Sequence, residues 1–131
     1  MPKEDQCRFA KTHEWAYPKG ETYLIGISDH AQHEITDVVF VELPKVGRKV
    51  KAGEACAVVE SVKAAFDIYA PVSGEVAVVN PELIKNPALV NLSPYDKGWF
   101  FEIKASDPKE LDALMDIASY RNFVKTADAH S

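Results

Sequence analysis

The sequence predicts a mostly β fold, either a sandwich or a small barrel. Short segments rich in strand-forming residues recur through the first part of the chain, with turn residues about every eight to twelve positions. The chain also lacks the long strand–helix–strand alternation that is typical of a doubly wound parallel sheet. The predicted strands are residues 23–27, 38–43, 46–50, 55–60, 65–69 and 75–79.

The first predicted strand, residues 23–27, leads into a short helix. Its sequence, Tyr-Leu-Ile-Gly-Ile, is rich in residues that favour strands. Ser28 follows, and serine is a residue type that commonly caps the start of a helix. We therefore expect a short helix over residues 30–35.

The next two strands are bounded by turn residues. The strand at 38–43 is expected to stop at Pro44, because proline has no N–H to donate to a sheet ladder. Residues 46–50 form a short edge segment, and the Lys-Ala-Gly sequence at 51–53 turns the chain.

Two further segments are predicted to form a β-hairpin. Residues 55–60 are mostly apolar and lead into a tight turn at 61–64. The chain returns over residues 65–69, where apolar and polar positions alternate as in a half-buried strand. After another turn, the strand at 75–79 completes the β-rich part of the prediction.

Two later helices have clear start signals. Asn80 precedes Pro81, which places a capping side chain before a proline at the first helical position. Asp107 precedes Pro108 in the same way, and Glu110 stands three residues after this cap, as in a capping box. One helical face should then pack on the sheets through Leu111, Leu114, Met115 and Ala118, and after a kink or break through Tyr120, Phe123 and Val124.

The charge balance and the apolar runs exclude two classes of function. The chain has 131 residues, with 15 Lys and Arg against 20 Asp and Glu, so its formal net charge is −5. Nucleic-acid binding needs a positive face, so we expect no nucleic-acid partner. No apolar run is long enough to cross a bilayer, so we expect no membrane contact. The charged N-terminus has no apolar signal segment, which favours a bacterial cytoplasmic protein.

The sequence holds no common enzyme signature. It has no Gly-rich phosphate loop, no G-x-S-x-G motif and no zinc-type cysteine spacing. Cys7 and Cys56 belong to no C-x-x-C pair, and a chain that is 47% hydrophobic needs no disulfide staple, so both are expected as thiols. His30 and His33 could begin a metal site, but no further ligand has suitable spacing and Glu34 is expected to point elsewhere. Solvated or locally bonded imidazoles are therefore the preferred interpretation, with no metal bound.

The most informative residue is Lys63, which is predicted to lie at the tip of the hairpin. Taken alone, a lysine in a surface turn is a solvated charge. The stretch from 59 to 76 resembles a lipoyl attachment site, however, because the modified lysine of lipoyl and biotinyl domains occupies a tight β-turn that an attaching enzyme can reach. Biotinyl sites typically carry Met on both sides of the lysine, whereas Val62 and Ala64 flank it here. The resemblance therefore implies lipoate, covalently attached to Lys63.

A narrower resemblance is to the glycine cleavage H-protein family. The Glu-Ser-Val-Lys-Ala sequence at 60–64 is similar to the attachment site of that family. Four other segments resemble the family in its own order and, with the lysine, cover most of residues 11–101. They are residues 11–15, 25–32, 37–44 and 91–95, the last followed by Gly98 and Trp99.

This resemblance implies a more specific fold. It is a barrel-sandwich hybrid of two small antiparallel sheets, of the lipoyl and biotinyl domain type, with short helices and a C-terminal helix. Residues 1–131 would form a single lipoyl-carrier domain. A monomer is expected.

The resemblance also implies a function without catalytic activity of the chain's own. The lipoyl arm would carry an aminomethyl group from a PLP-dependent glycine decarboxylase to a folate-dependent aminomethyltransferase. A dihydrolipoyl dehydrogenase would then reoxidise the arm, and lipoate-attaching enzymes would modify Lys63. The cofactor supplies the sulfur chemistry, and the protein supplies location and shielding.

The family also implies a shielded site for the loaded arm. It lies around the segment with Thr12 and Glu14, the short helix after Ser28, and Asp67. A carboxylate there can accept a charge-assisted hydrogen bond from the protonated amine of the cargo. We expect Glu14 to do so first, with Asp67 and the Thr12 hydroxyl as helpers.

The short helix departs from the family pattern at 33–36, which reads His-Glu-Ile-Thr. An arm contact usually assigned to a histidine cannot be moved onto His33, because the register differs by one residue, or about 100° of helical rotation. Glu34 occupies that place, so its role is open. Thr36 stands where many members have glycine, and we expect it to stiffen the turn.

Two other interpretations remain open. The chain could be a lipoate-relay protein that supplies lipoyl groups to other enzymes, and this role would need Lys63 equally. It could also be a biotinyl-type or unmodified structural domain, which the missing Met neighbours and the segment around Glu14 disfavour.

Overall fold

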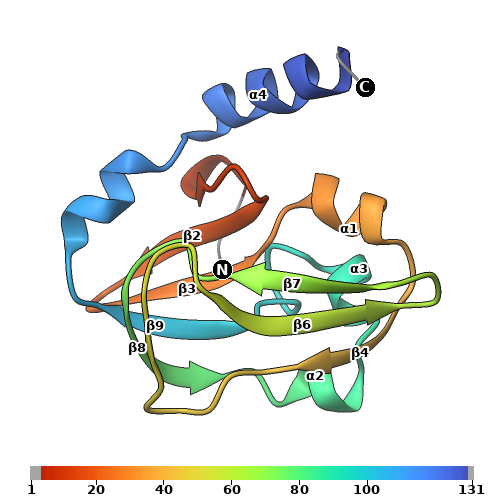
Figure 1. Ribbon diagram of the computed structural model, residues 1–131, viewed down its shortest axis with the longest axis horizontal. Coiled ribbons are helices and arrows are strands. Elements are labelled where there is room, and N and C mark those ends of the chain that lie inside the picture. The colour runs from red at the N-terminus through yellow and green to blue at the C-terminus, as the bar shows by residue number, and fades with distance from the viewer. Residues whose placement is uncertain (1–3, 130–131) are drawn as a thin grey trace.

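The computed structural model describes residues 4–129 and is built from two antiparallel sheets with short helices around them (Figure 1). One sheet has six strands in the order β1-β2-β3-β9-β8-β5, and the other has three in the order β4-β6-β7. The strands are β1 (Arg8–Phe9), β2 (Glu14–Lys19), β3 (Thr22–Ile27), β4 (Val38–Glu42), β5 (Lys49–Val50), β6 (Ala55–Ser61), β7 (Ala65–Tyr69), β8 (Gly74–Val79) and β9 (Phe101–Ala105). The prediction of a mostly β fold with two antiparallel sheets is confirmed.

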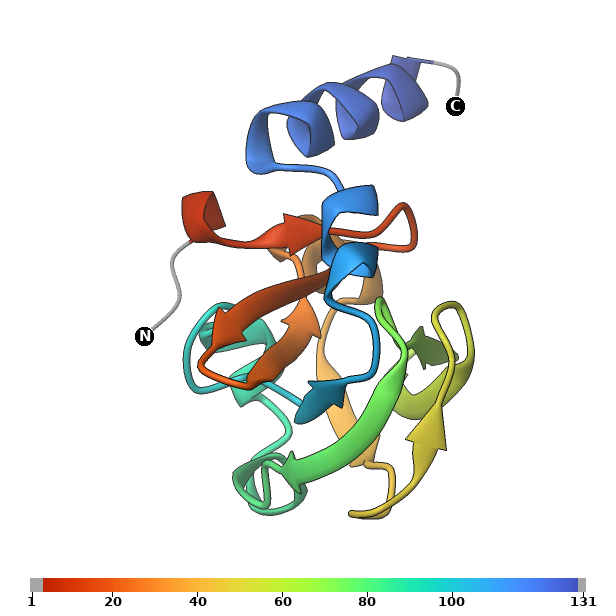
Figure 2. The ribbon, with the colours of Figure 1, turned by 90° about the vertical axis from the view of Figure 1, so that its left-hand side faces the viewer.

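Six helical segments accompany the sheets. They are η1 (Glu4–Gln6), α1 (Asp29–Ile35), α2 (Glu82–Lys85), α3 (Leu89–Leu92), η2 (Pro108–Ala113) and α4 (Ile117–Ala129), with η denoting 3₁₀ turns, and they are counted within residues 4–129. Figure 2 shows α4 outside the two sheets, beyond the strands near the N-terminus, and it packs mainly against β1 and η1. None of the helices in this part of the chain is long and apolar enough to cross a membrane.

The main core lies between the two sheets, as the alternation of apolar residues predicted. Ile25 and Ile103 enter it from the six-stranded sheet, and Val41, Val59 and Ile68 enter it from the three-stranded sheet. All five are buried, and burial of each such side chain stabilises the fold by about 1.5–3 kcal/mol relative to exposure.

A second apolar cluster surrounds Trp15 on the outer side of β2 and β3. Trp15 is fully buried, and its indole N–H donates to the carbonyl oxygens of Ile27 and Pro94 at 2.9 and 3.1 Å. A Cβ at position 26 would lie 2.4 Å from the Trp15 ring, which explains why Gly26 interrupts an otherwise apolar strand. Phe9 and Tyr120 belong to the same cluster.

The predicted β-hairpin and the predicted short helix are both present. Two predicted capping residues, Ser28 and Asn80, each accept a backbone hydrogen bond. Strands β6 and β7 flank the predicted turn, and Ser28 caps α1 by accepting a hydrogen bond from the Ala31 N–H at 3.0 Å. Asn80 accepts from the Glu82 N–H at 3.1 Å at the start of α2. The edge segment predicted at 46–50 is shorter as a strand, since β5 is Lys49–Val50, although Gly47 and Arg48 also make backbone hydrogen bonds to Val76 of β8.

The prediction of a capping box at Asp107, and of one helix that contains Leu111, Leu114, Met115 and Ala118, was wrong. Asp107 does accept from the Lys109 N–H, but the turn that follows is the 3₁₀ segment η2, which ends at Ala113. The Glu110 carboxylate does not return to the cap. It accepts instead from the Ser73 N–H at 2.7 Å and from the Ser73 hydroxyl at 3.0 Å. The Glu110 side chain therefore bonds to the loop that contains Ser73, which is distant in the sequence, and does not form the capping box.

The apolar face predicted across this helix is correspondingly divided. Leu114 is extended, and Met115 exchanges backbone hydrogen bonds of 2.7 and 2.9 Å with Phe9. Helix α4 then starts afresh, and the Asp116 carboxylate accepts from the Ser119 N–H at 2.8 Å. The break that was expected before Tyr120 therefore falls earlier, between Ala113 and Ile117.

Candidate functional site

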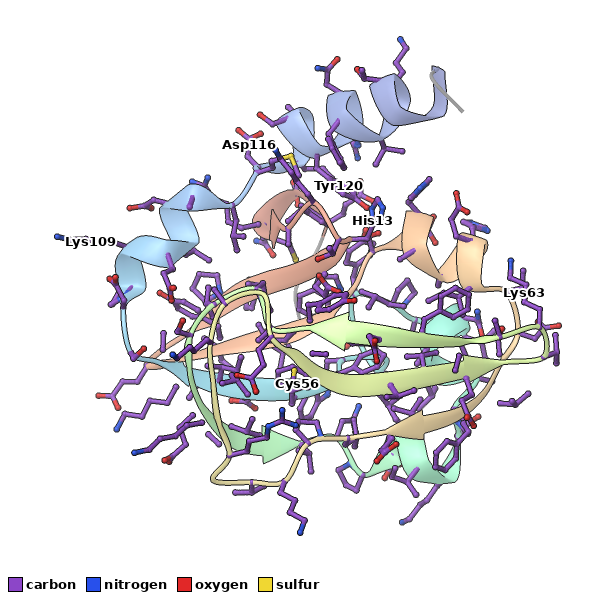
Figure 3. All side chains as sticks on the ribbon, viewed as in Figure 1. His13, Cys56, Lys63, Lys109, Asp116 and Tyr120 are labelled. Carbon is purple, nitrogen blue, oxygen red and sulfur yellow. The ribbon has the colours of Figure 1, made fainter. Side chains whose placement is uncertain are left out.

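The hairpin of β6 and β7 holds Lys63 at its tip, where the side chain is exposed (Figure 3). The Ser61 N–H donates to the Ala64 carbonyl at 2.8 Å, which closes the turn. The Ser61 hydroxyl accepts from the backbone N–H groups of Lys63 and Ala64 at 3.2 and 3.3 Å. A serine at the first position of a turn commonly makes such bonds, so the local sequence itself builds the support for the lysine.

The tip of the hairpin is fixed to the segment that follows α1. The Val62 N–H donates to the Asp37 carbonyl at 3.2 Å, while the Val62 side chain is 70% exposed. Lys63 lines a surface groove of about 290 Å³ together with His30, His33, Glu34 and Thr36. The lysine therefore stands over the outer face of α1.

A smaller cavity of about 140 Å³ lies on the inner side of α1. Segments far apart in the sequence form it: the turn before β2, the end of β3, helix α1 and strand β7. Glu34 lines both this cavity and the groove beside Lys63, so the two hollows adjoin at one residue. The cavity is lined by Thr12, His13, Glu14, Ile27, Ala31, Glu34, Ile35, Phe66, Asp67 and Ile68.

The structure places the three residues expected at the arm site together, because Thr12, Glu14 and Asp67 all line this cavity. Lys63 lies in the adjoining groove and not in the cavity itself. Asp67 is exposed at the rim, on β7 between Phe66 and Ile68, whereas Glu14 is only 1% exposed. The two carboxylates therefore differ sharply in their contact with water.

Glu14 is bonded on both of its carboxylate oxygens. Oε1 accepts from the Thr12 hydroxyl, and Oε2 accepts from the Tyr69 N–H at 3.1 Å. Since Glu14 belongs to β2 and Tyr69 to β7, this carboxylate joins the two sheets. Burial raises the pKa of Glu14 from its ordinary 4.5 to about 7, against the opposing effect of these hydrogen bonds.

The turn before β2 sets the position of this carboxylate. The His13 N–H donates to the Ala10 carbonyl, and the Ala10 N–H donates to the Glu14 carbonyl, both at 2.9 Å. His13 adopts a φ of 79°, in the left-handed region that most residues avoid. This tight turn directs Thr12, His13 and Glu14 toward one cavity.

Helix α1 forms the opposite wall, and its histidines are bonded locally, as the preferred interpretation held. His30 Nε2 lies 3.4 Å from Glu34 Oε1, and His33 Nε2 lies 3.4 Å from Asp29 Oδ2. The expectation that Glu34 points elsewhere was wrong for His30, because positions four apart share a helical face. Among residues 4–129, no group of three or more His, Cys, Asp or Glu side chains could hold a metal ion.

The end of α1 contains a strained residue. Thr36 has φ 68° and ψ −152°, a conformation that is essentially restricted to glycine. Asn91 supports it, because its side-chain amide donates to the Thr36 carbonyl at 2.7 Å and its Oδ1 accepts from the Val38 N–H at 2.9 Å. The expectation that Thr36 affects this turn therefore has a physical basis in its backbone geometry.

Both cysteines lie away from this chemistry. Cys7 and Cys56 are buried thiols, and the prediction that they form no disulfide is confirmed. Burial raises the pKa of each thiol to about 12, so neither forms a thiolate at neutral pH.

Sequence reasoning missed several residues of the cavity. Ala31, Glu34 and Ile35 have the three- and four-residue spacing of one helical face, and this spacing could have identified them once α1 was expected. His13 and Phe66 carry no such signal, because the fold alone brings them to the cavity.

Two antiparallel sheets with an exposed lysine at one hairpin tip are the arrangement that the resemblance to lipoyl and biotinyl domains implied. The sequence model described as "Glycine cleavage H-protein" matches residues 7–127. The chain therefore belongs to the glycine cleavage H-protein family.

Curated relatives agree with this assignment. The chain is 55% identical over 118 residues to the glycine cleavage system H protein of Thermus thermophilus, covering 90% of this chain and 92% of the relative. It is 51% identical over 121 residues to the H protein of Escherichia coli O139:H28, covering 92% and 94%. A crystal structure of a glycine cleavage system H protein from Mycobacterium marinum matches with a TM-score of 0.83 and 32% identity, covering 93% of this chain and 97% of that one.

Proposed function

We propose that this chain is the lipoyl-bearing shuttle of the glycine cleavage system and that lipoate is attached to Lys63 through an amide. The observation that carries the proposal is the placement of one exposed lysine beside a groove that adjoins a cavity with a buried carboxylate. The attached group would supply the sulfur that holds an aminomethyl cargo and the redox change that follows its release.

Lys63 suits attachment because the turn presents it without shielding. Its immediate neighbours Val62 and Ala64 are uncharged, and both are exposed. An attaching enzyme would have to remove the proton of the lysine amine before that amine attacks an activated acyl group. Amide formation would also remove the positive charge of Lys63. Burial of the tether would then not require the desolvation of a charge.

The cavity offers a buried carboxylate to the charged end of the cargo. An aminomethyl group carries an ammonium, and Glu14 is placed to accept a charge-assisted hydrogen bond from it. Asp67 at the rim and the Thr12 hydroxyl, which already bonds Glu14, would assist. The lining residues Ile27, Ile35 and Phe66 would exclude water from the folded-back arm.

The raised pKa of Glu14 predicts the direction in which a proton moves when the cargo enters the cavity. Near neutral pH the buried carboxyl is divided between its neutral and ionised forms, because its pKa is raised to about 7. An ammonium beside it favours the ionised form, so entry of the cargo would release a proton from Glu14. Capture of an ammonium cargo would therefore explain why this carboxyl is buried.

The partners that we propose are the glycine decarboxylase, the aminomethyltransferase, the dihydrolipoyl dehydrogenase and the lipoate-attaching enzymes. In this role residues 1–131 act as one monomeric carrier domain without catalysis of its own, in the bacterial cytoplasm. Support comes from the family assignment and from the bacterial sources of the relatives.

Intact mass spectrometry of protein purified from its native host tests the proposal. We expect the mass of one lipoyl amide, mapped to Lys63, in the wild type and in the control variant Lys51→Ala. Lys51 is also exposed and precedes a turn, but it lies away from the β6–β7 tip. Lys63→Ala should lose the added mass completely.

An unmodified Lys63 in native protein that supports glycine breakdown would overturn the proposal. The lipoate-relay interpretation requires the same lysine, so a separate assay distinguishes it. Purified glycine decarboxylase should load the lipoylated chain in a glycine-dependent reaction if the shuttle role is correct, and should leave it unloaded if the chain is only a relay.

A further inference from the structure

The C-terminal helix α4 reaches the walls of the cavity through the hydroxyl of one tyrosine. Tyr120 is only 3% exposed, and its ring stacks on Phe9 with a centroid separation of 4.4 Å and an interplanar angle of 10°. The Tyr120 hydroxyl lies 2.7 Å from His13 Nδ1 and 2.7 Å from Ser28 Oγ. Figure 3 shows Tyr120 and His13 side by side, where α4 passes over the turn before β2.

One partner of this hydroxyl lines the cavity, and the other stands at the start of the helix that forms the opposite wall. His13 lines the cavity and stands between Thr12 and Glu14. Ser28 caps α1, the helix that contributes Ala31, Glu34 and Ile35. The Tyr120 hydroxyl therefore adds a side-chain link between the wall that carries the buried carboxylate and the start of α1, beside the backbone bond in which the Ser28 N–H donates to the His13 carbonyl at 2.9 Å.

The hydrogen atoms of this network can be assigned by counting donors. The Ser28 hydroxyl already accepts from the Ala31 N–H at 3.0 Å. If Ser28 donates to Tyr120 and Tyr120 donates to His13 Nδ1, both hydroxyl hydrogens have acceptors. The reverse direction would leave the Ser28 hydrogen without an acceptor among these groups. Burial raises the pKa of Tyr120 to about 12, so the hydroxyl keeps its hydrogen at neutral pH.

The ring and the hydroxyl of Tyr120 perform separable tasks. The ring packs α4 onto Phe9, and a phenylalanine would retain that stacking. The hydroxyl adds two hydrogen bonds, a part-buried one to His13 and a buried one to Ser28, and a buried hydroxyl is unfavourable unless it is bonded. Helix α4 packs mainly against β1 and η1, and the Tyr120 hydroxyl adds hydrogen bonds from this helix to His13 and Ser28.

We propose that Tyr120 is a positioning residue, whose hydroxyl joins the His13 turn to the start of α1 and so fixes the width of the cavity that receives the loaded arm. The inference rests on the proposed function only for the identity of the occupant. Its structural content is that removal of the Tyr120 hydroxyl loosens both walls and admits water to Glu14.

Tyr120→Phe in the unmodified protein tests this directly. The Glu14 carboxyl, followed by carbon-detected NMR, should titrate below the wild type, with its pKa falling from about 7 toward 4.5, because water relieves the desolvation. The amides of His13 and Ser28, which donate to Ala10 and His13 carbonyls, should exchange about tenfold faster. Amides of the β6–β7 pair should exchange at wild-type rates.

Tyr17→Phe is the matched control, because Tyr17 packs against the same aromatic cluster from β2 and its replacement leaves the Tyr120 network intact. It should change neither the Glu14 titration nor the two exchange rates. The inference is overturned if Tyr120→Phe titrates and exchanges as the wild type does. It is also overturned if exchange rises equally in β6 and β7, since that result would mean general destabilisation.

A second pair of variants keeps the test valid if Tyr120→Phe does not fold. His13→Gly and His13→Asn both tolerate the positive φ of this position, but only asparagine offers an acceptor to the tyrosine hydroxyl. We expect His13→Gly to lower the pKa of Glu14 and His13→Asn to restore most of it. Equal behaviour of the two would refute the inference. These readouts use no lipoyl group, so an unmodified Lys63 would refute the proposed function and leave this result unaffected.

Discussion

The hairpin tip and the cavity are built in opposite ways. The tip around Lys63 is exposed, and the residues that shape it, Ser61 and Ala64, are its neighbours in the sequence. The cavity around Glu14 is buried, and its bonds reach from Thr12 to Tyr69 and, through His13, to Tyr120. A swinging arm needs a tip that enzymes can reach, whereas a shielded cargo needs walls that only the whole fold can hold.

The largest expected effect lies at the cavity. Because the folded protein binds the Glu14 proton more tightly than the unfolded chain does, Glu14 stabilises the fold fully below pH 4.5 and this contribution is lost as pH rises through about 7. Relative to the wild type, Glu14→Gln should therefore gain about 3 kcal/mol of unfolding free energy between pH 4.5 and about pH 8. Urea unfolding across this range measures the gain.

The same experiment contains its own control. At pH 4.5 and below, the glutamic acid is neutral in the folded protein, so the glutamine and the acid should differ little with pH. A stability difference that is constant over the whole range would mean that Glu14 is not held in a desolvated cavity.

A smaller effect is expected at the tip. Ser61→Ala removes the acceptor for the Lys63 and Ala64 N–H groups, so the turn should present the lysine in more than one geometry. The rate of enzymatic lipoylation should fall about tenfold, as expected for the loss of about one hydrogen bond, while the Glu14 titration stays unchanged. Ser73→Ala, which removes a bonded hydroxyl from another turn, is the control and should be lipoylated normally. Equal rates for both variants would contradict the proposed support of the lysine.

A still smaller effect is expected at Thr36, in the segment between the hairpin tip and the cavity. Thr36→Gly relieves the positive φ at the end of α1 and should raise the unfolding free energy by about 1 kcal/mol, measured by urea unfolding. Thr36→Ala keeps the Cβ and therefore the strain, so it should give no such gain. If alanine stabilised as much as glycine, the backbone conformation of Thr36 would not be the cause.

The smallest effect concerns partner docking at the tip. Glu60 and Asp37 are exposed acids near Lys63, and we expect them to face basic surfaces of the partner enzymes. Glu60→Gln should slow loading by the decarboxylase about twofold at low salt, and the difference should vanish at high salt. Loading rates that do not depend on ionic strength would rule out this electrostatic contribution.

The same contrast explains what the sequence could predict. The β6–β7 hairpin and the exposed Lys63 follow from a local pattern, and both are confirmed as structure. The grouping of Thr12, Glu14 and Asp67 was implied only by the family resemblance, because no periodicity connects Glu14 to a strand more than fifty residues later. The role of these residues in holding an arm stays a prediction.

The errors have the same origin. A capping box after Asp107 is a local pattern, and it failed because Glu110 found a distant partner in Ser73. Strand β2 was not predicted, because its first three residues are all buried and one of them is the acid Glu14, so the strand shows no apolar–polar alternation. The sequence predicted that Tyr120 packs on an apolar helical face, but nothing in it indicated the bond of its hydroxyl to His13, which lies 107 positions away.

The most direct test of the arm's return to the cavity is the NMR titration of the Glu14 carboxyl in three forms of the protein: unmodified, lipoylated and aminomethyl-loaded. We predict a pKa near 7 in the first two forms and a clear fall in the third, because only the loaded arm brings an ammonium beside the carboxylate. A Glu14 pKa that is the same in all three forms would show that the cargo does not enter this cavity.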